Sequence, residues 1–146
     1  MIGVALLAAV AAVAVYFAFG RRVANHPDLP EYTVPRFEVR PGRDTPFELA
    51  AVPAVPVTTK LVAFAFAMGD GDSEPSPVEA TVAMAPDGTV RLAGRGRTLE
   101  GSREVRVVLG AAADFKRYED ALGAARAGTS DGQVRVLVVP IVRVAQ

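Results

Sequence analysis

The sequence opens with an uninterrupted apolar run, residues 2–19 (IGVALLAAVAAVAVYFAF), which carries no charge and is followed closely by Arg21 and Arg22. As a helix rising about 1.5 Å per residue, this run would be roughly 27 Å long, close to the roughly 30 Å hydrocarbon core of a bilayer. A lone spanning segment must be helical, because only a helix satisfies its own backbone polar groups in lipid. Tyr16 and the two arginines fit the aromatic and cationic residues of a membrane interface. We therefore predict a single transmembrane anchor in residues 1–22.

Two alternatives to an anchor remain open for this run. It could be a cleaved signal peptide with Ala18-Phe19-Gly20 as the cleavage site, although the run exceeds the usual core of about 7–15 residues and no basic residue precedes it. It could also be a buried core helix, which so long an apolar run at the start of the chain disfavours. The bulky apolar residues that would form the anchor are Ile2, Leu6, Leu7, Val10, Val13, Phe17 and Phe19.

The orientation of the anchor rests on two conflicting indications. Arg21 and Arg22 follow the apolar run, and the positive-inside rule would place them and the following domain in the cytoplasm. A proline-containing tether followed by a β-rich domain is more familiar outside the cytoplasm, which is an analogy of layout. The preference for arginine over lysine, with abundant Ala, Val and Gly, indicates a GC-rich bacterial source. We expect the bacterial inner membrane with a periplasm-facing domain, and keep a cytoplasm-facing domain as the alternative.

The remainder of the chain has the size and composition of one domain. Residues 23–30 contain Pro27 and Pro30, which oppose regular helix, and they are predicted to form a linker. Residues 31–146 are long enough to bury a core without disulfides or metals. The absence of cysteine excludes disulfides, cysteine-ligated zinc, iron–sulfur clusters and thiol catalysis. The formal net charge of zero argues against a nucleic-acid binder.

Alternating apolar and polar residues predict a mainly β domain. The expected strands are residues 32–40, 47–52, 58–68, 78–84, 89–93, 104–109 and 133–144. In the strongest strand, Val62, Phe64, Phe66 and Met68 form a large face opposite small alanines, which predicts a central strand packed on both sides.

Prolines and glycines refine this strand pattern. Pro46 and Pro53 cannot donate ladder hydrogen bonds, so residues 47–52 are predicted to form an edge or interrupted strand. Pro86-Asp87-Gly88 predicts a hairpin turn between the fourth and fifth strands. Pro140 is expected to break the last strand, whose inward residues are predicted to be Val134, Val136 and Val138.

One segment changes to a helical period. In residues 114–127, an apolar stripe recurs every three or four residues, which predicts an amphipathic helix with Asp114 as N-cap and Gly128 after its end. Lys116 and Asp120 would form an i,i+4 pair. The helix could decorate an antiparallel connection or could be a crossover that makes the last two strands parallel. We favour decoration.

Seven short strands separated by turn signals predict a two-sheet, immunoglobulin-like β-sandwich with one α-helix inserted before the last strand. The chain has no cysteine and no tryptophan, so it lacks the Cys…Trp…Cys hallmark. The resemblance is therefore one of layout, and it implies no membership of the antibody-type family.

Catalytic signatures are absent from the sequence. The only histidine, His26, lies in the predicted linker, which excludes a Ser-His-Asp triad or a multi-histidine metal site elsewhere in the chain. No P-loop, G-x-S-x-G, G-x-G-x-x-G or zincin motif occurs. We expect neither enzymatic activity nor a cofactor.

Two clusters of charged residues could instead bind ligands or partners. Asp70, Asp72 and Glu74 resemble the start of a calcium loop, but no glutamate follows at the twelfth position, so a solvated hairpin tip is the favoured interpretation. A basic cluster could meet lipid headgroups or an acidic partner, or could simply face solvent beside glutamates. Its members are Arg91, Arg95, Arg97, Arg103 and Arg106.

An anchor, a tether, a compact β domain and no catalytic constellation together predict a non-catalytic, membrane-anchored binding or scaffolding module with a protein partner. The alternatives are a membrane-associated signalling accessory or regulator, a calcium-dependent lectin-like binder, and a hydrolase.

Overall fold

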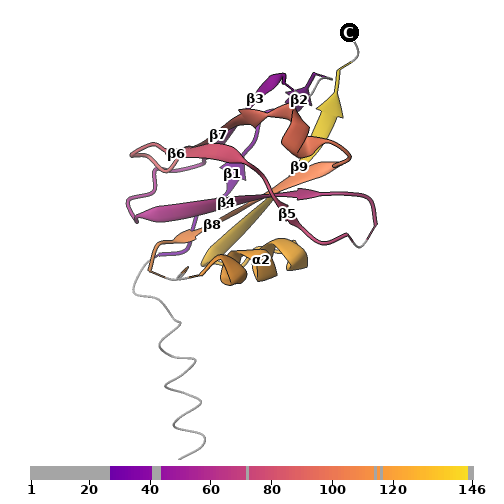
Figure 1. The fold of residues 1–146 in the computed structure, drawn as a ribbon. Coiled ribbons are helices and arrows are strands. Elements are labelled where there is room, and N and C mark those ends of the chain that lie inside the picture. The colour runs from indigo at the N-terminus through magenta and orange to yellow at the C-terminus, as the bar shows by residue number, and fades with distance from the viewer. Residues whose placement is uncertain (1–26, 41–43, 72, 114, 116, 145–146) are drawn as a thin grey trace, which may run out of the picture.

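The computed structural model describes residues 27–40, 44–71, 73–113, 115 and 117–144. These residues form two β-sheets and one α-helix (Figure 1), which confirms the prediction of a mainly β, sandwich-like fold. The predicted transmembrane anchor, residues 1–22, lies outside the described residues. Among the residues that are described, no helix is both long and apolar enough to cross a membrane.

The two sheets have four and five strands. The four-stranded sheet has the order β1 (Tyr32–Thr33), β3 (Pro46–Pro53), β7 (Val90–Arg95), β6 (Ala80–Met84). The five-stranded sheet has the order β2 (Phe37–Val39), β9 (Val134–Arg143), β8 (Glu104–Ala111), β4 (Leu61–Met68), β5 (Ser76–Pro77). The short 3-10 helix η1 (Gly96–Leu99) follows β7, and α2 (Tyr118–Ala127) lies between β8 and β9.

The described part of the chain has nine strands, and two local features explain the excess over the predicted seven. The predicted strand 32–40 divides around Pro35 into β1, which pairs with β3, and β2, which pairs in parallel with β9. Proline has no N–H and restricts the residue before it, so the chain changes sheets there. The two-residue β5 lies in the stretch predicted to be a loop.

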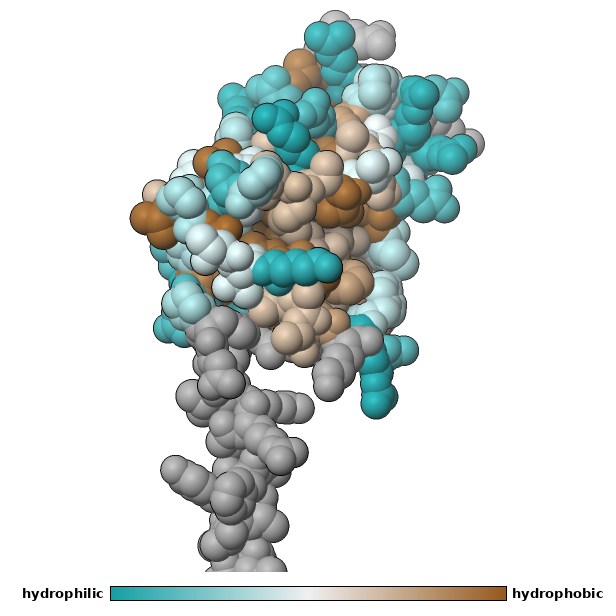
Figure 2. All heavy atoms as spheres, turned by 90° about the vertical axis from the view of Figure 1, so that its left-hand side faces the viewer, coloured by the Kyte–Doolittle hydropathy of each residue, from teal (hydrophilic) through white to brown (hydrophobic). Residues whose placement is uncertain are grey.

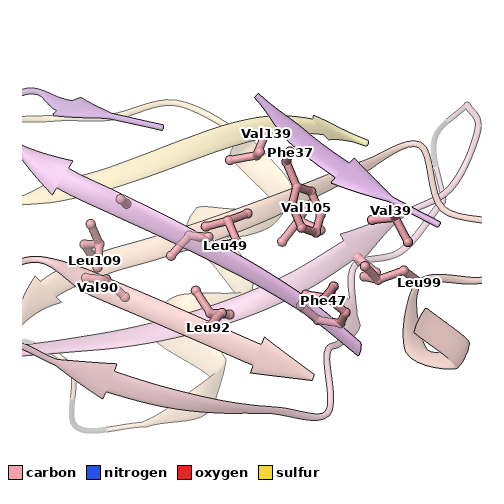
Figure 3. Close-up of a cluster of buried hydrophobic side chains, with 13 residues drawn as sticks. Phe37, Val39, Phe47, Leu49, Val90, Leu92, Leu99, Val105, Leu109 and Val139 are labelled. Atoms are coloured by element: carbon pink, nitrogen blue, oxygen red, sulfur yellow. The ribbon is translucent and has the colours of Figure 1, made fainter. Parts of the chain in front are cut away.

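The core between the sheets is formed by alternating apolar residues of strands from both sheets (Figure 3). Val90 and Leu92 of β7 and Val107 of β8 are fully or almost fully buried in it. The rings of Phe37 and Phe47 meet edge-to-face with their centroids 5.6 Å apart. This arrangement is the one that aromatic quadrupoles favour.

A second core lies on the other side of the five-stranded sheet, beneath α2 (Figure 1). Phe66 of β4 and Val108 of β8 are fully buried there, against Ala121 and Ala125 of the helix. The large face of β4 therefore packs on the helix, and its alanine face packs towards the other sheet. This confirms that the strand is covered on both faces, but its predicted central position is wrong, because β8 is the middle strand of the sheet and β4 lies next to the end strand β5.

The predicted inward residues of the last strand are confirmed only in part. Val134 and Val136 pack in the second core, beneath α2, whereas Val138 is 45% exposed because it lies outside this core. The residues that face the core between the sheets are Leu137, Val139 and Ile141.

The predicted break at Pro140 is wrong. Pro140 is exposed and lies opposite Glu104, and the next residue, Ile141, still donates its N–H to the Arg103 carbonyl at 2.9 Å. Because backbone groups alternate in direction along a strand, the N–H that proline lacks would point away from β8, to the side where pairing with β2 starts only at Ile141.

The helix is shorter than predicted and begins at Tyr118 with Arg117 as N-cap. Asp114 and Lys116 lie outside the described residues. The C-terminal prediction is confirmed, because Gly128 has a left-handed φ of 68° and its N–H donates to the Ala124 carbonyl at 2.9 Å. The antiparallel pairing of β8 and β9 confirms that the helix decorates an ordinary connection.

The prediction that residues 47–52 form an edge strand is wrong, because β3 lies between β1 and β7. The contact with β1 is limited to Val52 and Pro53, however, and the rest of β3 has only β7 beside it. The prolines mark the two ends of the strand, where a missing N–H costs least.

The last residues of the predicted linker pack on the domain. Leu29 is 2% exposed and lies against Val57 and Leu61. Its N–H donates to the Gly132 carbonyl at 2.8 Å, and its carbonyl accepts a 2.8 Å hydrogen bond from the Arg135 guanidinium. Leu29, two residues before the predicted boundary at residue 31, is therefore already packed on the domain.

Candidate functional site

The sheet edges are the places where this fold could accept another chain, because edge strands carry unpaired backbone N–H and C=O groups. In the described part of the molecule the strands at the ends of the two sheets are β1 and β6 of one sheet and β2 and β5 of the other. Because β1, β2 and β5 are short, much of β3, β9 and β4 beside them also has no described strand partner on that side.

Three of these edges carry features that oppose strand pairing. β1 and β5 are each two residues long, and prolines lie within or close to both. β2 is three residues long, contains the charged Glu38 and is flanked by Arg36 and Arg40. Short length, proline and charge are the usual means by which proteins prevent edge-to-edge association.

The fourth edge, β6, is the longest of the four and has none of these features within the strand itself, although Glu79 directly precedes it and Pro86 lies two residues after its end. Its five residues, ATVAM, include no charged residue, no proline and no glycine. It pairs with β7 along its whole length, from Ala80 opposite Gly94 to Met84 opposite Val90. An uncharged edge of this length is a template for strand addition.

The ladder with β7 determines which backbone groups of β6 are free. Ala85 N–H donates to the Thr89 carbonyl at 2.8 Å, and on the other side of β7 Gly96 N–H donates to the Thr45 carbonyl at 2.8 Å. Backbone groups alternate in direction along an antiparallel strand. The N–H and C=O groups of Thr81 and Ala83 therefore point towards β7. Those of Ala80, Val82 and Met84 point to the free side, where no described strand pairs with them.

The side chains of β6 leave this edge accessible. Val82 lies opposite the buried Leu92 but is 40% exposed, because the edge of the sheet is only partly covered. Ala80 and Met84 are half-buried against the core. The β6–β7 hairpin projects to the left in Figure 1. Figure 2 shows the molecule from that side: apolar and weakly polar residues fill much of the middle of the face, one hydrophilic side chain lies across them, and further hydrophilic residues border them.

The turn that ends β6 is held by several hydrogen bonds. Gly88 has a φ of 93°, which the bulge after the turn requires, and this confirms the predicted turn chemistry. The Asp87 carboxylate accepts the Thr89 N–H at 2.9 Å, and this hydrogen bond lowers the pKa of the carboxyl. The Tyr32 hydroxyl donates to the Gly88 carbonyl at 3.0 Å, and burial, followed by the charge of Asp87, raises the pKa of Tyr32. The hairpin therefore presents β6 on a fixed support.

The predicted arginine cluster does not form one patch. Arg91 lies on the outer face of the four-stranded sheet, where it pairs with Glu48 at 3.2 Å. Arg106 lies on the helix-covered face of the five-stranded sheet, on the opposite side of the molecule, where it pairs with Glu104 at 2.9 Å. Residues close in sequence are separated because β7 and β8 belong to different sheets.

The other predicted arginines have separate surroundings. Arg95 donates to the Asp44 carbonyl at 2.7 Å, and Arg97 lies 3.8 Å from Glu79. Arg103 is exposed. Only Arg106 has a clear structural role, because its guanidinium donates to the Ala125 carbonyl at 2.6 Å at the C-terminal end of α2.

The predicted calcium loop is attached to the helix. The Glu74 carboxylate accepts hydrogen bonds from Arg126 at 2.6 and 3.2 Å, and these raise the pKa of Arg126. Asp70 is exposed, and Asp72 lies outside the described residues. Over the described residues, no group of three or more His, Cys, Asp or Glu side chains is arranged to hold a metal ion. Glu74 therefore serves as an ion-pair partner of α2.

A polar groove of about 780 Å³ lies beside η1. Its lining residues are Asp44, Pro77, Glu79, Arg97, Thr98 and Glu100. The Thr98 hydroxyl donates to the Arg95 carbonyl at 3.0 Å, and Glu79 is near Arg97. Among the described lining residues, the Thr98 hydroxyl therefore donates to a backbone carbonyl and not to a carboxylate base.

Comparisons with known proteins find no match to this chain among protein-family models, curated proteins or solved structures.

The free edge was not apparent from the sequence. The alternation in residues 78–84 predicted a strand, but the order of strands within a sheet depends on pairing between distant segments. The one available signal was composition, since five consecutive residues lack charge, proline and glycine.

Proposed function

We propose that this chain is a non-catalytic, membrane-anchored binding module that recognises a protein partner through the free edge of β6. The observation that carries the proposal is that β6 is the longest strand at an end of either sheet and contains no charged residue, proline or glycine, whereas β1, β2 and β5 are only two or three residues long. Strand addition to such an edge gives affinity through main-chain hydrogen bonds and specificity through alternate side chains.

We assign the sandwich an immunoglobulin-like topology. The order β1-β3-β7-β6 corresponds to strands A-B-E-D of that fold, and β9-β8-β4 corresponds to G-F-C. In this assignment α2 occupies the F–G connection. Folds of this layout commonly serve as binding modules, which supports the proposal by analogy.

The anchor in this proposal is residues 1–22, in a bacterial inner membrane with the domain facing the periplasm. Its support is the apolar run itself, together with the attachment of Leu29 to the domain, which leaves only a short stretch between the two. A partner would therefore meet the domain close to the membrane surface.

The test of binding places a photoreactive benzoylphenylalanine at Val82 in the full chain, in its native membrane. A matched control carries the same group at Val138, a valine of similar exposure (45% against 40%) on the other sheet. We expect a specific covalent adduct from position 82 that is absent from position 138. If position 82 gives no adduct, or if both positions give the same adducts, the β6 edge is not the binding surface.

The test of topology uses the absence of cysteine from the chain. Asp70→Cys introduces one exposed thiol without disturbing the positive φ of Gly71. We expect a membrane-impermeant maleimide to label it in intact spheroplasts, with the product in the membrane fraction. Labelling in the soluble fraction would indicate a cleaved signal peptide. Labelling only after lysis would favour the second candidate, a cytoplasm-facing signalling accessory.

A further inference from the structure

The β6 edge matches itself, and we propose that its partner is the β6 strand of a second copy of this chain. The two strands would run antiparallel about a two-fold axis at Val82. This inference rests on the proposed use of the β6 edge for binding and adds the identity of the partner.

The backbone of β6 has the symmetry that such a pair requires. The outward-facing residues Ala80, Val82 and Met84 are arranged symmetrically about Val82. In the antiparallel pair, Val82 would face Val82 of the second copy, and Ala80 would face the second copy's Met84. Each facing pair would exchange two backbone hydrogen bonds, about six in total.

The side chains are equally compatible with this register. No residue of β6 carries a charge, so no like charges would meet across the axis. The nearest charged residue before the strand, Glu79, would lie opposite Ala85 of the second copy. The exposed Val82 would be covered by Val82 of the second copy. A partner strand that carried charged residues would instead place a charge against this apolar side chain.

The dimer of two β6 edges would also be a closed assembly, which cannot add a third copy through the same edge. Both copies would use the same edge, so the contact is isologous and stops at two chains. The other described edges carry features that oppose further strand addition. Two four-stranded sheets would thus join into one continuous sheet across the axis.

A five-residue ladder gives a small interface, and we therefore expect weak association of dilute chains. Two chains anchored in one membrane would meet at a higher effective concentration. The dimer is accordingly expected to form in the membrane more readily than in dilute detergent.

Single cysteines test the register directly, because the natural chain has none. At a hydrogen-bonded antiparallel pair the Cα atoms are about 5.5 Å apart, within the range of a disulfide. We expect Val82→Cys in the full chain, oxidised mildly in membranes, to give a disulfide-linked dimer. The matched control, Val138→Cys, is expected to stay monomeric.

Two further variants fix the alignment. Ala80→Cys mixed with Met84→Cys should give a mixed disulfide, because these residues would face each other across the axis. Neither variant alone should dimerise, since like positions would be separated by four residues, roughly 13 Å along the strand. An Ala80→Cys homodimer, or equal dimerisation of Val138→Cys, would overturn the proposed register.

The outcomes separate this inference from the proposed function. If Val82→Cys stays monomeric while benzoylphenylalanine at position 82 links to a different protein, the edge binds another chain, and the second-copy proposal fails alone. If neither experiment gives a product at position 82, both fail. Unchanged circular dichroism of Val82→Cys shows that a negative result does not arise from misfolding.

Discussion

Phe66 and Phe64 share the helix-facing side of β4, but only Phe66 is fully buried. Truncating a fully buried phenylalanine removes its transfer free energy and leaves a cavity, so Phe66→Ala should lower the free energy of unfolding by roughly 3–5 kcal/mol. Phe64→Ala should cost less, because Phe64 is half-buried at the rim of the same cluster. Chemical denaturation of the full chain in detergent checks the order of the two losses. Equal losses would contradict the burial described here.

The Asp87 carboxylate makes the stability of the folded domain depend on pH. Its pKa is lowered in the folded state by the hydrogen bond from Thr89, so its contribution is fully present above the ordinary value of 3.8 and is lost as the pH falls through the lowered value. Asp87→Asn keeps a side-chain oxygen acceptor but cannot titrate. We expect the stability difference between wild type and Asp87→Asn to be constant at neutral pH and to change below about pH 3.8. If the difference in unfolding free energy between the two proteins is the same at every pH, the hydrogen bond does not lower the pKa of Asp87.

The C-terminal end of α2 depends on a residue from the sheet. Arg106 and Glu104 are each 15% exposed, and the Arg106 guanidinium donates to the Ala125 carbonyl. A cation at a helix C-terminus donates hydrogen bonds to carbonyls that have no partner within the helix, and it interacts favourably with the negative end of the helix dipole. Arg106→Gln should therefore cost roughly 1.5–3 kcal/mol in unfolding free energy, the range for a hydrogen bond to a charged group.

The matched control for Arg106 is Arg91→Gln, which removes an exposed ion pair with Glu48. Exposed pairs contribute about 0–1 kcal/mol, so this variant should be almost neutral. The same denaturation series measures both variants. Comparable effects of the two substitutions would show that Arg106 does not support the helix.

At the scale of elements, the sequence predicted what depends on local pattern. The β6–β7 hairpin, its Pro86-Asp87-Gly88 turn and the end of α2 at Gly128 all follow from neighbouring residues. The sequence could not predict which side chains of β9 point to which core. The five-stranded sheet has a second buried face beneath α2, and alternation alone cannot distinguish one buried face from the other. The division around Pro35 depends on pairing with two distant strands.

The same limit applied to the candidate site. The acidic loop and the arginines were selected for their closeness in sequence, but Glu74 pairs with Arg126, and Arg91 and Arg106 belong to opposite faces. The β6 edge carries no chemical motif. It becomes a candidate only when the strand order shows that this uncharged strand lies at the end of its sheet.

At the scale of the whole molecule, β6 is the longest of the four described strands that lie at the ends of the two sheets. The other three are two or three residues long, and β6 alone among the four combines five residues available for pairing with the absence of any charged residue or proline. The proposed anchor would hold this edge near a membrane, where a weak strand contact between two anchored chains becomes effective. The protein would then act through association and not through chemistry at a pocket.

Amide hydrogen exchange along β6, resolved to single residues, tests this claim most directly. In dilute detergent, the amides of Thr81 and Ala83, which point to β7, should exchange slowly, and those of Ala80, Val82 and Met84 should exchange fast. In membranes that contain the full chain at high density, all five should be protected. If the amides of Ala80, Val82 and Met84 exchange as fast in the membrane as in dilute detergent, the edge stays unpaired and the proposed binding surface is wrong.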